Sequence, residues 1–282
     1  MNPAASPPVL VVGGTSPIGR AVVGAFGGAE IGTLAVGRST APSLDVADAD
    51  QVRAVLESAR PETIVYLANP AVVGLDRDSA AHALDALASF AESAVRSGSR
   101  RIVFASSAAV YGSDGESPFE EGSPTAPHGA YAQLKLDSEN ALRSIAERDG
   151  IDVVVLRIFN VFGPGLSRSL VNRLFLDEEV PQLWLTDDFV RDYIHVDDVA
   201  RNVAAAATEE TEGFSVVNVG SGRGVSNRRL AELAGVGAYL PAVSPIQPSR
   251  VVADVTRARQ RWGLRTAISV EDAAEDPQLL LR

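Results

Sequence analysis

The sequence predicts an α/β protein built around a doubly wound parallel sheet. Short apolar runs, which are typical of strands buried on both faces, alternate with longer segments of helical pattern. Alternation of single strands with single helices is typical of a sheet that carries helices on both faces. The 282 residues suit one large domain of this class, or one with a small appended lobe.

Most of the expected elements lie in the first part of the chain. Strands are expected at residues 8–14, 32–37, 63–68, 101–107 and 152–160. Helices are expected at residues 17–28, 49–58, 77–97 and 130–148. The regularity weakens after "FGPG" (162–165), and "FSVVNVGSG" (214–222) is expected to return to the sheet. We therefore assign residues 1–165 and 196–220 to the sheet domain, and residues 166–195 and 221–282 to a small discontinuous C-terminal lobe, with 166–195 and roughly 221–255 as loops and short helices.

The composition argues against several kinds of binding partner. The formal charge of −11 argues against nucleic acid, because no excess of cations is present to displace phosphate counterions. The chain has no cysteine, which excludes disulfides, zinc–thiolate sites and cysteine nucleophiles, and no metal site is expected. The first apolar run is too short for a signal peptide or a membrane span. We expect a cytoplasmic protein with a small-molecule substrate and no membrane partner.

A glycine turn follows the first expected strand. The stretch "VLVVGGTSPIGRAVV" places Gly13, Gly14 and Gly19 between that strand and the first helix. Glycines allow a tight turn and let the backbone approach a pyrophosphate at the positive helix N-terminus. The turn therefore predicts a dinucleotide site on a Rossmann-type sheet. Expected cofactor contacts are Gly13, Thr15, Ser16, Pro17, Ile18 and Gly19 in the turn, and Leu67, Ala68 and Asn69 after the third strand.

The end of the second strand bears on which dinucleotide binds. An NAD-binding turn usually has an Asp or Glu about 20 residues further on, which holds the ribose hydroxyls. Here "LAVGRST" offers Arg38 and Ser39 and no acid, which favours NADP, with NAD as the alternative. An exposed arginine without a role is the simpler interpretation of Arg38. Asp45, followed by Val46, is expected either to meet the adenine or to cap the helix that begins near residue 49.

Lys135 is the only lysine in the chain, while 24 of the 25 basic residues are arginine. It follows Tyr131 by four residues in "YAQLK", so both side chains lie on one face of a helix. A phenol has a pKa near 10, and a nearby ammonium favours the phenolate and lowers that pKa. The pair predicts that Tyr131 is a catalytic acid/base assisted by Lys135.

A pair of serines ends the fourth strand in "FASSAAVYG". Ser107 is expected to hydrogen-bond the oxygen that reacts with Tyr131. Ser106 is the alternative, because only one of two successive strand residues can face the site.

Together these residues resemble the extended short-chain dehydrogenase/reductase family, the NAD(P)-dependent sugar epimerase/dehydratase group. The resemblance is carried by the glycine turn, "SSAAVYG", "YAQLK", "LRIFNVFGPG", "RDYIHVDDVA", "NVGSGRGVS" and "ADVTRARQRWG". It implies that Tyr131 is the acid/base, that Lys135 holds the nicotinamide ribose and that Ser107 orients the substrate oxygen. It also implies a homodimer formed through the helices at 77–97 and 130–148.

For the substrate, the resemblance implies that Asn160 lies near the phosphates or sugar and that Arg191 grips a nucleotide-sugar pyrophosphate. An ion pair of Arg191 with Asp192 or Asp198 is the structural alternative. Arg250 is a further candidate phosphate ligand, and His128 a candidate pocket residue. His195 is expected to pack structurally.

The chain departs from the family pattern at three places. Ser16, followed by Pro17, stands where the middle glycine of the cofactor turn is usual. The asparagine–glycine–threonine pattern of the third long helix is not recognisable in "HALDALASFAESA". The stretch between Gly165 and Arg191 is short, so the substrate lobe is expected to be reduced.

The resemblance leaves several reactions open. We expect NADPH-dependent reduction of a keto group on a nucleotide-activated sugar, since Arg38 favours a dissociable NADPH. The alternative is a nucleotide-sugar epimerase with tightly bound NAD. A 4,6-dehydratase is rejected, because Ala108 and Ala109 follow Ser107 and cannot move protons. A non-catalytic NADP-sensing regulator is less favoured, because the Tyr131–Lys135 pair is retained.

Overall fold

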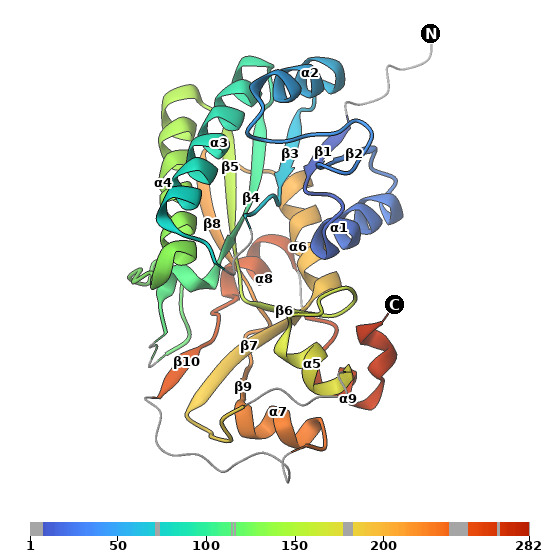
Figure 1. The fold of residues 1–282 in the computed structure, drawn as a ribbon, viewed down its shortest axis with the longest axis vertical. Helices are drawn as coiled ribbons and strands as arrows, with labels where there is room; N and C mark the ends of the chain where they lie inside the picture. The colour runs from blue at the N-terminus through green and yellow to red at the C-terminus, as the bar shows by residue number, and fades with distance from the viewer. Residues whose placement is uncertain are drawn as a thin grey trace.

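A computed structural model describes residues 8–70, 74–113, 115, 117–176, 183–236, 248–263 and 266–281. Within these residues the main sheet has six parallel strands in the order β2-β1-β3-β4-β5-β8 (Figure 1). The strands are β1 Val9–Val12, β2 Thr33–Val36, β3 Thr63–Tyr66, β4 Arg101–Ser107, β5 Asp152–Ile158 and β8 Phe214–Val219. This is the expected doubly wound sheet.

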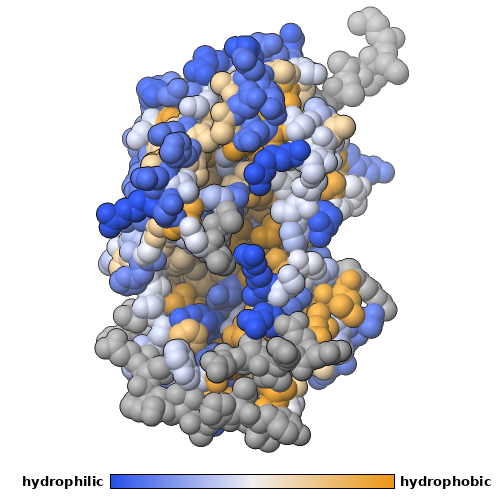
Figure 2. Space-filling model, in the orientation of Figure 1, coloured by the Kyte–Doolittle hydropathy of each residue, from blue (hydrophilic) through white to orange (hydrophobic). Residues whose placement is uncertain are grey.

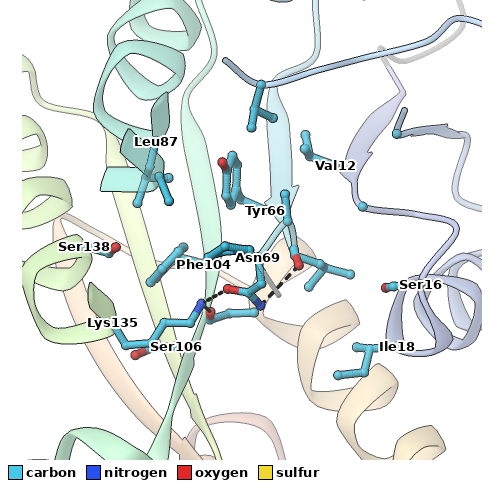
Figure 3. A pocket seen from close by; sticks show the side chains of 18 of the residues that line it. Val12, Ser16, Ile18, Tyr66, Asn69, Leu87, Phe104, Ser106, Lys135 and Ser138 are labelled. Carbon is cyan, nitrogen blue, oxygen red and sulfur yellow. Dashed lines mark hydrogen bonds between the residues drawn. The ribbon is translucent and has the colours of Figure 1, made fainter. Parts of the chain in front are cut away.

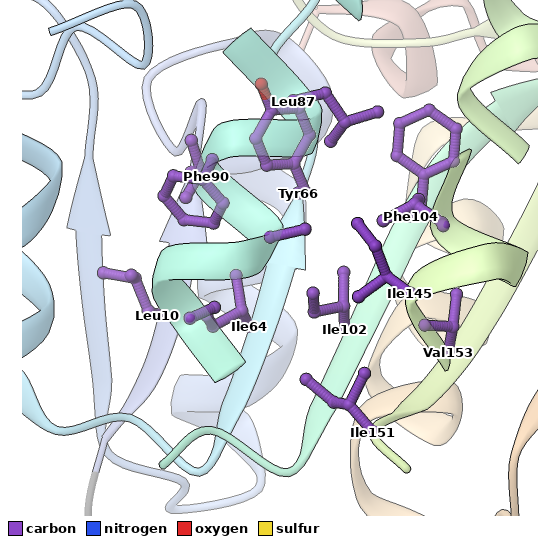
Figure 4. Packing of buried hydrophobic residues seen from close by; sticks show 14 of the residues in the cluster. Leu10, Ile64, Tyr66, Leu87, Phe90, Ile102, Phe104, Ile145, Ile151 and Val153 are labelled. Atoms are coloured by element: carbon purple, nitrogen blue, oxygen red, sulfur yellow. The ribbon is translucent and has the colours of Figure 1, made fainter. Parts of the chain in front are cut away.

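Helices cover both faces of the main sheet. Those of the described segments that pack on it are α1 Pro17–Gly28, α2 Ala49–Ala59, α3 Arg77–Arg96, α4 Gly129–Asp149, α6 Val196–Thr208 and α8 Thr256–Trp262. Side chains of α2, α3 and α4 pack against one face, where Phe90 meets Tyr66 and Ile64 (Figure 4). Side chains of α1, α6 and α8 form the core on the other face, around Phe26 and Val199. The two apolar cores hold the sheet rigid between them.

The sequence explains where several helices begin. Ser16 caps α1 through its Oγ, which accepts from the Gly19 N–H at 3.0 Å, and Pro17 occupies the first turn, where its missing N–H is tolerated. Asp48 caps α2 by accepting from the N–H groups of Asp50 and Gln51. The expectation that Asp45 could cap this helix is therefore wrong: the helix begins at Ala49 as expected, and the N-cap position directly before it is held by Asp48, three residues after Asp45.

The expected strands and helices of the first part of the chain are confirmed, with one change. The strand expected at 152–160 ends at Ile158, and β6 Asn160–Phe162 belongs to a second sheet. The chain thus passes from one sheet to the other around Phe159. The predicted return of "FSVVNVGSG" to the main sheet is confirmed by β8 at its edge.

The second sheet has the order β10-β7-β6, and β9 pairs with β7 antiparallel. Its remaining strands are β7 Phe189–His195, β9 Gly224–Ser226 and β10 Ser249–Val251. The expectation of loops and short helices is wrong for 189–195, and also for the short strands β9 and β10 within 221–255. The sequence hides β7 because Asp192 interrupts its apolar pattern while being fully buried, where its carboxylate accepts from the N–H groups of Ser221, Gly222 and Ala253.

Short helices surround the second sheet: α5 Leu170–Leu176, α7 Asn227–Leu233, α9 Val270–Glu275 and the 3₁₀ turn Pro277–Leu280. They enclose a third apolar cluster that includes Phe162, Val171 and Leu230. The proposed division of the chain into two domains stays a prediction. Among the described residues, no helix combines the length and apolarity that a membrane span requires.

Candidate active site

A cavity of about 670 Å³ lies at the carboxyl ends of β1, β3 and β4. In the sheet, β2 and β3 lie on opposite sides of β1, so the order of the strands reverses at β1. Doubly wound sheets bind their ligands at the carboxyl ends of the strands where this reversal occurs. Figure 2 shows one face of the molecule hollowed near its middle, with hydrophobic surface inside the hollow. Residues of the cavity wall include Val12, Gly13, Thr15, Ser16, Pro17, Ile18, Arg38, Asp45, Val46, Leu67, Ala68, Asn69, Ser106, Ser107, Tyr131, Lys135 and Leu166 (Figure 3).

The glycine turn forms one wall of this cavity. Gly13 has φ +86°, and a Cβ at this position would lie 3.1 Å from the backbone N of Ala68. A side chain would therefore be strained and would push against β3. Ser16, which replaces the usual glycine, uses its hydroxyl to cap α1, so this departure is accommodated by the helix itself. The open turn and the helix N-terminus fit a pyrophosphate.

The end of the cavity beside β2 carries one positive and one negative side chain, Arg38 and Asp45. Arg38 is exposed and contributes to the wall, and Asp45 is half-buried, with its Oδ1 accepting from the Ala47 N–H at 3.1 Å. Ser39 is exposed and is not part of the cavity wall. A carboxylate is thus present near the site after all, and Arg38 alone does not decide between NADP and NAD.

Lys135 is the most unusual residue of the cavity. It is only 2% exposed, and its Nζ donates to the carbonyl oxygen of Ala105 at 2.6 Å and to Oδ1 of Asn69 (Figure 3). Burial lowers its pKa to about 7, although the charge of Glu139 acts in the opposite direction. An ammonium has three donors, so one donor remains to bind a ligand in the cavity.

Tyr131 lies beside the lysine, with 5.9 Å between Lys135 Nζ and its ring centroid. Burial raises the pKa of the Tyr131 phenol, and a hydrogen bond with Ser107 lowers it by less. The expectation that Lys135 brings the pKa of Tyr131 below its ordinary value is therefore wrong. The physical reason is that the phenol is itself buried, and the cost of desolvating the phenolate outweighs the favourable contact with Ser107.

The two serines have separate partners. Ser106 is buried, and its Oγ donates to Glu139 Oε1 at 2.5 Å. Ser107 is half-buried, its Oγ accepts from the Ala109 N–H at 3.2 Å, and it acts on the Tyr131 phenol, whose pKa it lowers. The alternation of strand residues therefore brings Ser107 to the phenol and turns Ser106 to the helix behind it.

Sequence reasoning missed the buried ion pair behind the site. Arg157 of β5 donates from Nη2 to Glu139 Oε2 at 2.7 Å, and both side chains are more than 90% buried. Two signals could have found it. Glu139 follows Lys135 by four residues on the same helix face, and Arg157 is the one charge inside the apolar run "VVVLRIF".

The expected substrate residues other than Ser107 lie beyond the cavity wall. Asn160 is exposed and donates from Nδ2 to the carbonyl oxygen of Asp192 at 3.0 Å. Arg191 stacks on Phe189, with 3.7 Å from its guanidinium to the ring centroid, and donates to Ser249. His128 is exposed directly before α4. None of these residues is part of the cavity described above, and their contacts with substrate stay predictions.

Arg191 and Arg250 occupy neighbouring parallel strands. Val251 is the register partner of Arg191, so Arg250 points to the opposite face of the second sheet. Two arginines on opposite faces are poorly placed to hold one pyrophosphate. His195, by contrast, is buried against Phe162 and bonds the Leu279 carbonyl, as expected of a structural residue.

Comparison with known proteins agrees with this geometry. Residues 9–220 match the model of the NAD dependent epimerase/dehydratase family. The chain belongs to this family. A UDP-glucose 4-epimerase of Azospirillum brasilense is 31% identical over 92% of this chain and 87% of its own length. A UDP-glucose 4-epimerase of Corynebacterium glutamicum is 33% identical over 62% of this chain and 63% of its own.

Solved structures agree on the fold of this family member. The UDP-glucose 4-epimerase from Brucella ovis in complex with NAD has a TM-score of 0.83 at 24% identity, covering 98% of this chain and 99% of that one. MoeE5 in complex with UDP-glucose and NAD has a TM-score of 0.80 at 26% identity, covering 95% and 96%. The protein is therefore an enzyme of the extended short-chain dehydrogenase/reductase type, with a Rossmann-type sheet and a small second sheet.

Proposed function

We propose that the protein is a nucleotide-sugar 4-epimerase that keeps NAD bound, with a UDP-hexose as its substrate. The observation that carries the proposal is the 31% identity to the Azospirillum brasilense UDP-glucose 4-epimerase over nearly the whole of both chains. The sequence puts a keto sugar reductase first and a nucleotide-sugar epimerase second, and the proposal reverses that order. MoeE5, which binds UDP-glucose and NAD in its crystal structure, supports the same substrate class.

The residues of the cavity suit such a reaction. NAD, when bound, supplies the acceptor and donor of a hydride. Tyr131, as a phenolate, takes the proton from the sugar hydroxyl as the carbonyl forms, and returns it after the keto sugar has presented its other face; this requires that positive charge beside the phenol offset the burial that raises its pKa. In this proposal Ser107, which interacts with the Tyr131 phenol, orients the reacting oxygen. Lys135 supplies a buried positive charge beside the phenol.

The test starts with freshly purified protein. We expect about one NAD per chain after acid extraction, and conversion of UDP-glucose to UDP-galactose with no added cofactor, followed by NMR. Tyr131→Phe is the control: it should keep its NAD and lose turnover by roughly 10²–10⁴-fold. Protein that purifies without NAD and leaves UDP-glucose unchanged would overturn the proposal.

A reductase that uses NADPH is the second candidate, because exposed Arg38 is part of the cavity wall where a 2′-phosphate would lie. The same experiment separates the two. An empty protein that binds NADPH far more tightly than NADH would favour the reductase. Dimer formation through α3 and α4 stays a prediction from the family resemblance.

A further inference from the structure

The support of Lys135 comes from an unexpected element. Helix α3, which is described along its whole length, contributes His82, Ala83, Ala86 and Leu87 to the cavity wall, and none of these side chains carries an amide. The helix thus offers no asparagine to the site, as "HALDALASFAESA" predicts. The side-chain amide that accepts a hydrogen bond from Lys135 belongs instead to Asn69, three residues after the end of β3.

The position of Asn69 follows from the sheet. Leu67 continues β3, since its N–H donates to the Val12 carbonyl at 2.9 Å, and the chain then leaves the sheet at its carboxyl edge. Ala105 lies near the carboxyl end of β4, which is the next strand. Lys135 reaches over from α4, so its Nζ meets one acceptor from each of two adjacent strand ends (Figure 3).

We propose that Asn69 is the positioning residue of this active site, and that its side-chain oxygen fixes Lys135 in the place and charge state that the reaction needs. At 2% exposure the ammonium has little contact with water, so each acceptor is decisive. The acceptor at Ala105 is a backbone carbonyl, which no substitution removes, whereas the acceptor at Asn69 is a side-chain oxygen, which a substitution can remove. With both bonds made, the third N–H of Lys135 remains for the cofactor ribose or the substrate.

The consequence for protonation is specific. Hydrogen bonds to a charged form favour that form, so Asn69 opposes the loss of the Lys135 proton that burial promotes. An apolar residue of similar size at position 69 should lower the pKa of Lys135 by on the order of one unit or more. A carboxylate at the same position should raise it by about 1–3 units. The rise follows from the added charge of the carboxylate alone, so the fall in the apolar variant is the result that a purely structural role of Asn69 would not produce.

The composition of the chain makes this measurable directly. Because Lys135 is the only lysine, protein grown with lysine carrying ¹³C at Cε and ¹⁵N at Nζ gives one side-chain signal to follow. Its Cε shift, followed from pH 5.5 to 10, reports the pKa of Lys135 alone. The variants are Asn69→Leu and Asn69→Asp, and His82→Leu is the matched control, since His82 belongs to the same cavity wall and its ring bonds the Asp78 carbonyl on its own helix.

Opposite shifts for Asn69→Leu and Asn69→Asp, with His82→Leu like the wild type, are the expected result. Unchanged values in both Asn69 variants, or shifts in the same direction, would overturn the proposal. If Asn69→Leu does not fold, Asn69→Ala takes its place, because it also removes the side-chain oxygen that accepts from Lys135. The role of Asn69 in turnover rests on the proposed function, but the titration needs no substrate, so it stands or fails separately from the epimerase assignment.

Discussion

Glu139→Gln is the substitution whose effect follows most directly from the buried structure. Glu139 accepts from Arg157 Nε at 3.1 Å and from Nη2 at 2.7 Å, and from Ser106 Oγ at 2.5 Å. Arg157 also stacks on Tyr111, with 4.8 Å to the ring centroid. A glutamine keeps the shape of the side chain and removes its charge. Arg157 would then be a buried cation with no opposite charge beside it.

The magnitude follows from that loss. Removing one partner of a buried ion pair costs about 3–5 kcal/mol of unfolding free energy, because the remaining charge stays desolvated. For a chain of 282 residues that corresponds to a fall in Tm of roughly 5–8 °C. Since Glu139 also acts to keep Lys135 charged, the same variant should lower the pKa of Lys135 further.

Thermal and urea unfolding at pH 7 would measure the effect. The double variant Glu139→Gln, Arg157→Met removes both charges and should recover part of the lost stability. Arg148→Gln is the control, because its ion pair with Asp149 is on the surface and its loss should not measurably change Tm. A Glu139→Gln protein within about 1 kcal/mol of the wild type would refute the reasoning, since it would mean that Arg157 finds other partners.

Three further predictions use other parts of the site. Between pH 7 and about 9, Lys135 keeps its proton in the unfolded chain but has begun to release it in the folded protein. The unfolding free energy of the wild type should therefore rise with pH, and more than that of Lys135→Met. Urea unfolding at stepped pH would measure the difference. Gly13→Ala, which places a Cβ 3.1 Å from the Ala68 N at φ +86°, should reduce NAD retained on purification at least about tenfold, whereas Gly27→Ala, with open space around it, should not. Arg38→Ala should weaken NADPH roughly 10–100-fold and NADH little in calorimetric titrations, and an equal loss for both would remove Arg38 from cofactor choice.

The main sheet was predictable because its signals are local. Each strand of the first half is a short apolar run, and the first three helices each begin after a capping side chain, which is Ser16 for α1, Asp48 for α2 and Asp76 for α3. Even the separation of Ser106 from Ser107 follows from the period of a strand. Such features require no knowledge of which segments meet in space.

The second sheet and the support of the site were not predictable in this way. In β7 the buried Asp192 looks like a loop residue until the N–H groups of Ser221, Gly222 and Ala253 are seen around it, and these come from 29 to 61 positions away. The contact of Asn69 with Lys135 spans 66 positions. The pKa of Tyr131 is raised, whereas the sequence predicted that it is lowered, and the reason is the same. Burial depends on the whole fold, while the spacing of Tyr131 and Lys135 shows only that they share a helix face.

The structure also accounts for the single lysine in a chain that otherwise uses arginine. The Lys135 Nζ is enclosed by Ala105, Asn69 and the ring of Phe104, whose centroid is 4.6 Å away. An ammonium can satisfy two of its three donors there and keep one for a ligand. A guanidinium has five donors in a planar fork and does not deprotonate, so most of them would be buried without acceptors. Elsewhere arginine serves, as in the Arg157–Glu139 pair, where a bidentate fork matches a carboxylate. The enclosure of Lys135 by two strand ends therefore requires an amine at this one position.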